Sequence, residues 1–297
     1  MKRAVMCACL WGITPILYAN DAIQLLNSMS AAVHELEYQG DLVYSQGEGF
    51  TVLRIEHSLE KGIEREKVTN IDGSNSHEIS HDAENFSIAS FPQVTTEMQK
   101  VYSFDVGGIA DVAGRKCTEI VARPKDRMRY LHRYCVDTKT NMLLNYSLVN
   151  SQHKTVEKMM FTHIEYDKQK FIKFIKNKAS EVKNKFRPFD LVKHKENATK
   201  WYFTELPKGF HIDSVLRKAE PDSDSPLEQI ILTDKVTSIS VFIEPESEHC
   251  INKKGFTYNG AVNGLTVEKE GHSITVIGEV PRSTLTKVMD SLRYLSQ

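Results

Sequence analysis

The sequence predicts an α+β protein: a large, curved antiparallel sheet wrapped around helices, followed by a smaller α+β domain. Three patterns predict this fold. A stretch with helical spacing of apolar residues follows residue 20, about eight or nine strand-like segments run to residue 167, and strand-like segments resume at Trp201 before a final helix. The 297 residues are 40% hydrophobic and 26% charged, which suits packed cores and two domains better than one.

Residues 1–19 are predicted to be a signal peptide. Lys2 and Arg3 form a basic start, an apolar stretch follows, and Ala19 precedes a polar sequence. The apolar stretch is about 14 residues long, short of the roughly 20 that span a bilayer. Leu17 suits a cleavage site poorly, so an uncleaved anchor is the alternative. We expect an exported protein that is soluble after cleavage.

Residues 20–167 form the first predicted domain. We expect Asp21 to cap a helix with apolar residues three or four apart on one face: Ile23, Leu26, Met29, Val33 and Leu36. The pattern then changes to strand-like segments such as FTVLRIEHSL, CTEIVA, RYLHRYCV and KMMFTHIEY, separated by turn-forming stretches. Many short strands after one helix favour a sheet that curves around helices.

Residues 168–200 differ in composition, with eleven lysines and arginines against three acidic residues. They predict either a basic amphipathic helix for an anionic membrane or acidic partner, or a solvated linker, which we favour. Residues 201–297 form the second predicted domain. Its strands are YFTEL, IILTD, SISVFIEP, GLTVEK and SITVIGEV, and its helix runs from Thr284 to Leu295.

Three cysteines follow the predicted signal peptide: Cys117, Cys135 and Cys250. Export to an oxidising compartment favours one bridge and leaves one thiol over. A hairpin centred on Asp126 would place Cys117 directly opposite Cys135, with Cβ atoms about 4.5–5.5 Å apart. We predict a Cys117–Cys135 disulfide, with two buried free thiols as the alternative. The redox state of Cys250 stays open.

The string His77-Glu78-Ile79-Ser80-His81 matches the H-E-x-x-H zinc motif, which needs a helix to place both imidazoles one turn apart. Here it lies between turn-forming stretches, and in a strand the two histidines would stand about 13 Å apart. The sequence contains no nucleophile elbow, phosphate-binding loop or dinucleotide fingerprint. We predict a protein that is not an enzyme and uses no metal or cofactor. A net charge of −1 also gives no basis for nucleic-acid binding.

A series of segments in a fixed order carries a family resemblance. The series begins with YQGDLVYSQGEGFTVLRIEH and GIEREKVTNIDG, continues through DVAGRKCTEIVARPKDRMRYLHRYCVDTKTNMLL and MMFTHIEY, and ends with LPKGF, LTDKVTSISVFIEP and SITVIGEVP. Together these segments resemble the MucB/RseB family of periplasmic sigma-E regulatory proteins. The stretches that do not match are residues 168–200 and 211–228.

The resemblance implies a LolA-like N-terminal domain, which is an unclosed half-barrel with helices, and a smaller C-terminal domain. It implies a periplasmic negative regulator that binds the periplasmic region of a single-pass anti-sigma factor and protects it from regulated proteolysis. Lipopolysaccharide or the acyl chains of mislocalised lipoproteins would be the stress signal, and a homodimer is a candidate assembly. The alternative is a LolA-like periplasmic lipoprotein carrier. The domain after Trp201 counts against that alternative, because such a carrier needs only the first domain.

Two sets of candidate site residues follow. A groove inside the curved sheet would suit a lipid, although each candidate lining residue also suits a plain core position: Leu42, Tyr44, Leu53, Ile55, Phe86, Ile88 and Phe91. Histidines stand where the family commonly has two arginines, so a grip on an anionic ligand there would depend on pH, with neutral surface variation as the alternative. The candidate contacts to a partner or anion are His77, His81, Arg129, Lys173, Lys176, Lys183, Lys185 and Arg187.

Overall fold

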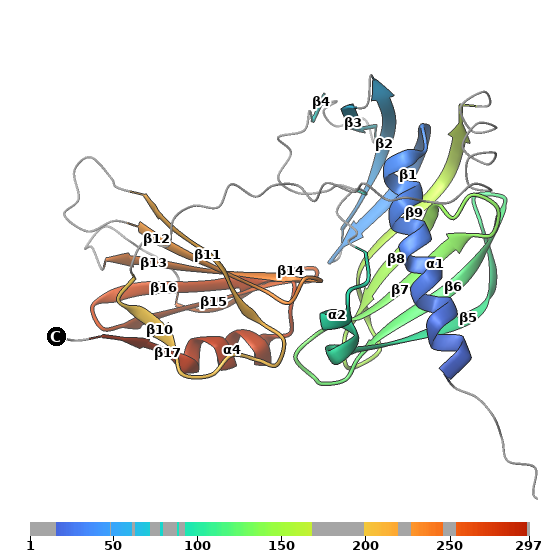
Figure 1. Ribbon diagram of the computed structural model, residues 1–297. Helices are drawn as coiled ribbons and strands as arrows, with labels where there is room; N and C mark the ends of the chain where they lie inside the picture. The colour runs from blue at the N-terminus through green and yellow to red at the C-terminus, as the bar shows by residue number, and fades with distance from the viewer. Residues whose placement is uncertain are drawn as a thin grey trace, which may run out of the picture.

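The computed structural model describes residues 16–47, 49–60, 63–71, 78–79, 88, 93–167, 199–218, 227–245 and 254–295. Within these ranges the chain builds two hydrophobic cores, one under a long N-terminal sheet and one in a smaller C-terminal unit. Figure 1 shows the two units side by side, with helix α1 against the first sheet and helix α4 in the second unit.

The N-terminal sheet has nine strands among the described residues, in the order β4-β3-β2-β1-β9-β8-β7-β6-β5. Neighbouring strands pair antiparallel. The edge strands β4 and β5 do not pair with each other, so the curved sheet is unclosed, as predicted. The strands are β1 (Tyr38–Gln46), β2 (Gly49–Glu60), β3 (Ile63–Asn70), β4 (Glu78–Ile79), β5 (Tyr102–Val112), β6 (Arg115–Pro124), β7 (Leu131–Asp137), β8 (Leu143–Val149) and β9 (Thr155–Tyr166).

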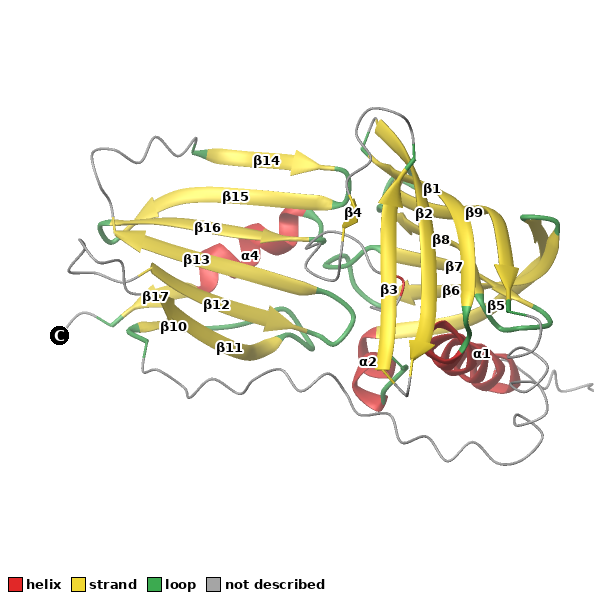
Figure 2. Cartoon of the chain, turned by 90° about the horizontal axis from the view of Figure 1, so that it is seen from above, coloured by secondary structure: helices red, strands yellow, loops and turns green. Residues whose placement is uncertain are grey.

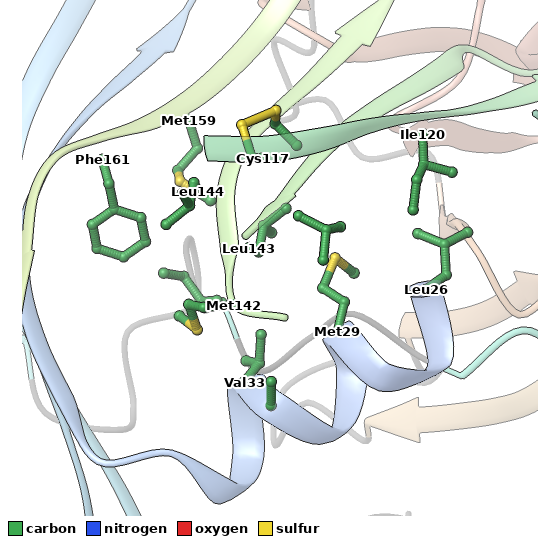
Figure 3. Close-up of a cluster of buried hydrophobic side chains, with 14 of the residues drawn as sticks. Leu26, Met29, Val33, Cys117, Ile120, Met142, Leu143, Leu144, Met159 and Phe161 are labelled. Atoms are coloured by element: carbon green, nitrogen blue, oxygen red, sulfur yellow. A yellow bond between two sulfur atoms is a disulfide. The ribbon is translucent and has the colours of Figure 1, made fainter. Parts of the chain in front are cut away.

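Helix α1 (Ile16–Glu35) fills part of the concave face of this sheet. Figure 3 shows Leu26, Met29 and Val33 directed from α1 toward side chains of the sheet, and all three are buried. The predicted apolar face of the helix is therefore confirmed. The predicted cap at Asp21 is wrong, because the helix begins at Ile16 and Asp21 lies exposed within it.

The disulfide between Cys117 and Cys135 is present, and both cysteines are buried. The predicted register of the hairpin is wrong by two residues, because Cys117 lies opposite Asp137 and Cys135 opposite Glu119. The bridge therefore joins diagonal neighbours on β6 and β7, whose Cα atoms are 5.3 Å apart. The register differs because the strands are joined by a longer loop, residues 125–130, rather than by a tight turn at Asp126.

The C-terminal unit has a six-stranded sheet in the order β11-β12-β13-β16-β15-β14, with α4 (Arg282–Ser291) behind it in Figure 2. A two-stranded ribbon of β10 and β17 completes the unit. Its strands are β10 (Trp201–Phe203), β11 (His211–Lys218), β12 (Leu227–Thr233), β13 (Ser238–Pro245), β14 (Gly255–Asn259), β15 (Val262–Lys269), β16 (His272–Gly278) and β17 (Leu292–Tyr294).

The predicted final helix is too long at its C-terminal end. Residues Leu292–Tyr294 leave the helix and pair with Trp201–Phe203. Burial of Leu292 and a ring contact of 4.9 Å between Tyr294 and Trp201 stabilise the ribbon in place of another helical turn. The sequence patterns also missed the short helix α2 (Thr96–Val101) and the strands β5, β11 and β14.

Candidate functional site

The loop between β6 and β7 joins the two units through the buried side chain of Arg129. Its Nη1 donates a hydrogen bond of 2.6 Å to Asp126, and its Nε donates to Asp234 of the C-terminal unit. Its Nη2 donates to the main-chain oxygen of Lys208, and the guanidinium stacks 4.8 Å from the ring of Phe210. The Arg129 and Asp234 side chains are fully buried, so each charge depends on the other.

The same loop makes a second set of contacts with the C-terminal unit. The hydroxyl of Tyr130 accepts a hydrogen bond of 2.9 Å from Asn263, and Thr284 at the start of α4 donates one of 2.7 Å to the main-chain oxygen of Met128. Tyr130 also belongs to a small buried cluster that includes Ala261. The β6–β7 loop is therefore the main docking element between the units.

The turns of two hairpins also meet at this junction. Gly260, in the turn between β14 and β15, has φ +58°, and a Cβ atom there would lie 2.1 Å from the Cγ of Gln46 at the end of β1. Only glycine adopts this backbone conformation readily and leaves room for the neighbouring strand. The close approach holds the β14–β15 turn of the C-terminal sheet against the end of β1 in the curved sheet.

Aromatic and polar side chains line the concave face beside this junction. The strand pairing places Tyr44, Tyr146 and Glu157 on one face of the sheet. Met159 of β9 lies opposite both Tyr44 and Tyr146, and Glu157 is two residues before Met159 on the same face. We call the group the junction cluster, and it consists of Tyr44, Tyr102, His132, Tyr134, Tyr146 and Glu157. Tyr44, Tyr134 and Tyr146 are half-buried, whereas Glu157 keeps 8% of its surface exposed.

Hydrogen bonds connect part of the junction cluster. His132 Nδ1 lies 2.8 Å from the Tyr146 hydroxyl, and His132 Nε2 lies 3.3 Å from the Tyr102 hydroxyl. Burial lowers the pKa of His132 to about 4, with a smaller opposing effect of Asp234. The imidazole is therefore neutral near pH 7 and donates from one nitrogen while accepting at the other.

Glu157 is the acidic member of the junction cluster. Its pKa is raised to about 7, chiefly by burial and secondly by the nearby negative charge of Glu279, while a hydrogen bond with Tyr44 partly opposes these two effects. Its Oε2 has no hydrogen-bond partner in the part of the chain that the structure describes. A buried carboxylate with an unsatisfied oxygen is costly unless a ligand or proton meets it.

A second acidic group lies at the far end of α1 and behaves in the opposite way. Glu64 of β3 lies 2.9 Å from His34 Nδ1 and 3.0 Å from His57 Nε2, while His57 Nδ1 lies 2.6 Å from the Leu36 oxygen. Burial alone would raise the pKa of Glu64, but the two histidine hydrogen bonds outweigh it and lower the pKa to about 2. This cluster fastens the end of α1 to β2 and β3.

The predicted lipid-lining residues lie mostly in the packed core. Leu42, Leu53, Ile55 and Ile88 are buried and belong to the cluster that packs on α1, and Tyr44 packs against it as well. Phe86 and Phe91 lie outside the described residues. The structure thus brings five of the seven residues together beneath α1.

Of the eight predicted contacts to a partner or anion, Arg129 alone lies within the described residues. Arg129 is buried in the junction, where its guanidinium already binds Asp126, Asp234 and a main-chain oxygen, so it offers no free surface charge in this conformation. The other seven, which are His77, His81, Lys173, Lys176, Lys183, Lys185 and Arg187, lie outside the described residues, as does Cys250. The neighbouring Glu78 and Ile79 form β4, so this part of the H-E-x-x-H string is a strand and not the helix that the zinc motif needs.

Within the described ranges, no group of three or more histidine, cysteine or acidic side chains is arranged to hold a metal ion. No helix in those ranges has the length and apolar character needed to cross a membrane.

Sequence patterns could have identified Glu157, although we did not single it out. In the segment Glu157-Lys158-Met159-Met160-Phe161, the acidic residue occupies the same phase as the buried Met159 and Phe161. A charged residue at a core-facing position is the signal. Its electrostatic interaction with Glu279, which lies 122 positions further along the chain, has no comparable local signal in the sequence.

The fold and the junction define a class: a two-domain protein in which an unclosed half-barrel around a helix is docked, through a buried arginine, onto a small sheet-and-helix unit. Residues 21–186 match the MucB/RseB N-terminal domain, and residues 195–293 match the MucB/RseB C-terminal domain. The chain belongs to the MucB/RseB family.

Curated relatives agree with this assignment. The chain is 24% identical over 298 residues to the Sigma factor AlgU regulatory protein MucB of Pseudomonas aeruginosa, covering 94% of this chain and 93% of the relative. It is 22% identical over 291 residues to the Sigma-E factor regulatory protein RseB of Escherichia coli K12, covering 91% and 90%.

Solved structures share the fold. The crystal structure of MucB in complex with MucA(peri) matches with a TM-score of 0.71 at 22% identity, covering 93% of this chain and 100% of that chain. A crystal structure of MucB matches with a TM-score of 0.61 at 21% identity, covering 93% and 98%. The relation therefore includes both domains of this chain.

Proposed function

We propose that this protein is a periplasmic negative regulator of sigma-E-type signalling. It binds the periplasmic region of a single-pass anti-sigma factor and protects that factor from regulated proteolysis. The observation that carries the proposal is the match of both domains to the MucB/RseB family, whose relatives are sigma factor regulatory proteins. The fold shared with MucB in complex with MucA(peri) supports binding of an anti-sigma factor.

Release of the anti-sigma factor in response to a lipid is part of the proposal. Lipopolysaccharide or lipoprotein acyl chains would enter the curved sheet and compete with α1 for residues such as Leu42 and Ile55, which are now buried. Movement of α1 or of the sheet would then reach the C-terminal unit through the junction cluster and Arg129. Lipid and anti-sigma factor would thereby oppose each other without sharing one surface.

The lipoprotein carrier is the competing proposal, and it requires the acyl chain itself to be the cargo. The extensive docking of the second unit through Arg129, Tyr130 and Thr284 supports a regulator instead, because a carrier of the LolA type has no need of that unit.

A regulator that acts as a homodimer would show twice the monomer mass by light scattering.

Calorimetry would test the proposal. The protein, purified from the periplasm with its predicted mature start at residue 20, is titrated with the periplasmic segment of the host's anti-sigma factor, with and without lipopolysaccharide or an acylated peptide. We expect saturable binding that the lipid weakens. Failure to bind the segment, together with stoichiometric uptake of acylated peptide, would replace the regulator with the carrier.

A further inference from the structure

The carboxylate of Glu157 is an unsatisfied acceptor in an acidic surrounding. Its Oε2 lacks a hydrogen-bond partner among the described residues, and Glu157 is more than nine-tenths buried. The charge that acts on it belongs to a second acid, Glu279 of the C-terminal unit, which also acts on Tyr44 and Tyr146. Glu279 itself is exposed, so the acidic pair reaches from solvent into the junction.

Aromatic rings flank this carboxylate on both sides. Glu157 lies opposite Gln46 of β1 and Leu148 of β8, so Tyr44 and Tyr146 occupy the two diagonal positions on the same face. The rings of Tyr134 and Tyr146 lie 5.2 Å apart at the next position across the sheet. A carboxylate with tyrosine residues on both neighbouring strands can bind an ammonium or guanidinium group, through an ion pair and cation–π contacts.

Two cationic or titratable residues in or beside the junction cluster, Arg129 and His132, do not fill this role. Arg129 is committed to Asp126 and Asp234, and His132 is neutral near pH 7. An incoming cation would therefore satisfy Glu157 without displacing an existing ion pair of the described residues.

We propose that the junction cluster is a receptor for one basic side chain, a lysine or an arginine, presented by the anti-sigma factor segment. The source of that side chain rests on the proposed function, whereas the preference for a cation rests on Glu157, Glu279 and the flanking tyrosines. Occupation of this site would place the partner between the half-barrel and the C-terminal unit. It would also hold Glu157 ionised, so binding should strengthen as the pH rises from about 6 to 8.

The first experiment measures binding of the segment to the full mature chain by calorimetry. Glu157→Gln should weaken binding about tenfold to a hundredfold, the range for loss of a charge-assisted hydrogen bond, and should remove its pH dependence. Glu165→Gln is the matched control, because Glu165 lies on the same strand with 60% of its side chain exposed. Replacing each basic residue of the segment with Met should reveal one position whose effect disappears in Glu157→Gln. If no position shows this coupling, the assignment to a peptide side chain is wrong.

The second experiment separates the site from its partner. n-Butylammonium, which imitates a lysine side chain, is titrated into the wild type and both variants while tyrosine ring signals are followed by NMR. We expect shifts in the wild type and Glu165→Gln that are lost in Glu157→Gln. Shifts without segment binding would leave the cation site standing and overturn the proposed function, and absence of shifts would overturn the site. Displacement of butylammonium by phosphatidylethanolamine vesicles, but not by the segment, would assign the ammonium group to a lipid and refute the peptide.

Discussion

The two halves of the concave face of the N-terminal sheet differ in their side chains: one half is packed and apolar, and the other carries polar groups. Around α1, side chains such as Met29, Leu143 and Phe161 interlock as a closed apolar core (Figure 3). Toward the C-terminal unit, the same sheet presents tyrosines, His132 and an acid with an unsatisfied oxygen. One continuous surface therefore has two kinds of neighbour: α1 packs on the apolar half, and the polar half faces the C-terminal unit.

The largest expected effect comes from breaking the junction itself. Arg129→Ala should lower the free energy of unfolding by about 3–5 kcal/mol, because it leaves the buried Asp234 carboxylate without its partner. Urea denaturation measures the change. Arg123→Ala, on the exposed side of β6, is the control and should cost less than about 0.5 kcal/mol. Equal effects of the two substitutions would show that Arg129 does not hold the units together.

Next in size is a cavity in the apolar half. Met29→Ala should lower the free energy of unfolding by about 2–5 kcal/mol, since the buried side chain leaves a void between α1 and the sheet. Gln24→Ala, on the exposed face of the same helix, should change it by less than about 0.5 kcal/mol. A small loss for Met29→Ala would mean that α1 packs loosely and that a lipid could displace it easily.

Removal of the disulfide should have an effect of about 3 kcal/mol. The Cys117–Cys135 bridge closes a loop with a sequence separation of 18 residues, and opening it increases the freedom of the unfolded chain. The double variant Cys117→Ala/Cys135→Ala is compared with the oxidised wild type by thermal and urea unfolding. A loss below about 1 kcal/mol would contradict the expected contribution of the bridge.

The smallest effect sharpens the polar half and depends on pH. Burial raises the pKa of Glu157 from 4.5 to about 7, so its contribution to stability is complete below pH 4.5 and is lost as the pH rises through 7. The loss should be about 2–3 kcal/mol between these limits. Glu157→Gln should flatten this part of the stability profile. Glu165→Gln should not, and Glu64, with a pKa of about 2, stays ionised throughout.

Local sequence patterns predicted much of the fold because the burial of side chains along one helix or strand sets the spacing of apolar residues. The apolar spacing of α1 and the alternation in β2 or β9 follow directly from which side chains face the core. Strand β5 was missed because Gly107 and Gly108 interrupt its pattern at a bulge, where the pairing with β6 shifts. The end of α4 was misplaced because the pairing of Leu292–Tyr294 depends on a partner about 90 residues earlier, which no helical pattern can reveal.

The candidate site was less predictable for the same reason. The disulfide could be predicted from residue types and a hairpin, even though the register was shifted. Arg129 was expected to contact a partner, but its guanidinium turned inward because Asp234 lies within reach only after the two units dock. Likewise, Glu157 acquires its raised pKa from burial and from Glu279, which belongs to the other unit. Properties that arise between domains have no signature in either segment alone.

The ribbon of β10 and β17 determines how the C-terminal unit would respond to mechanical tension. Trp201 is paired with Tyr294, so the chain enters and leaves this unit at the same end of two antiparallel strands. A force applied between the start of β10 and the end of β17 would act on one hydrogen-bonded pair at a time, and the ribbon would open like a zipper before the six-stranded sheet carried any load.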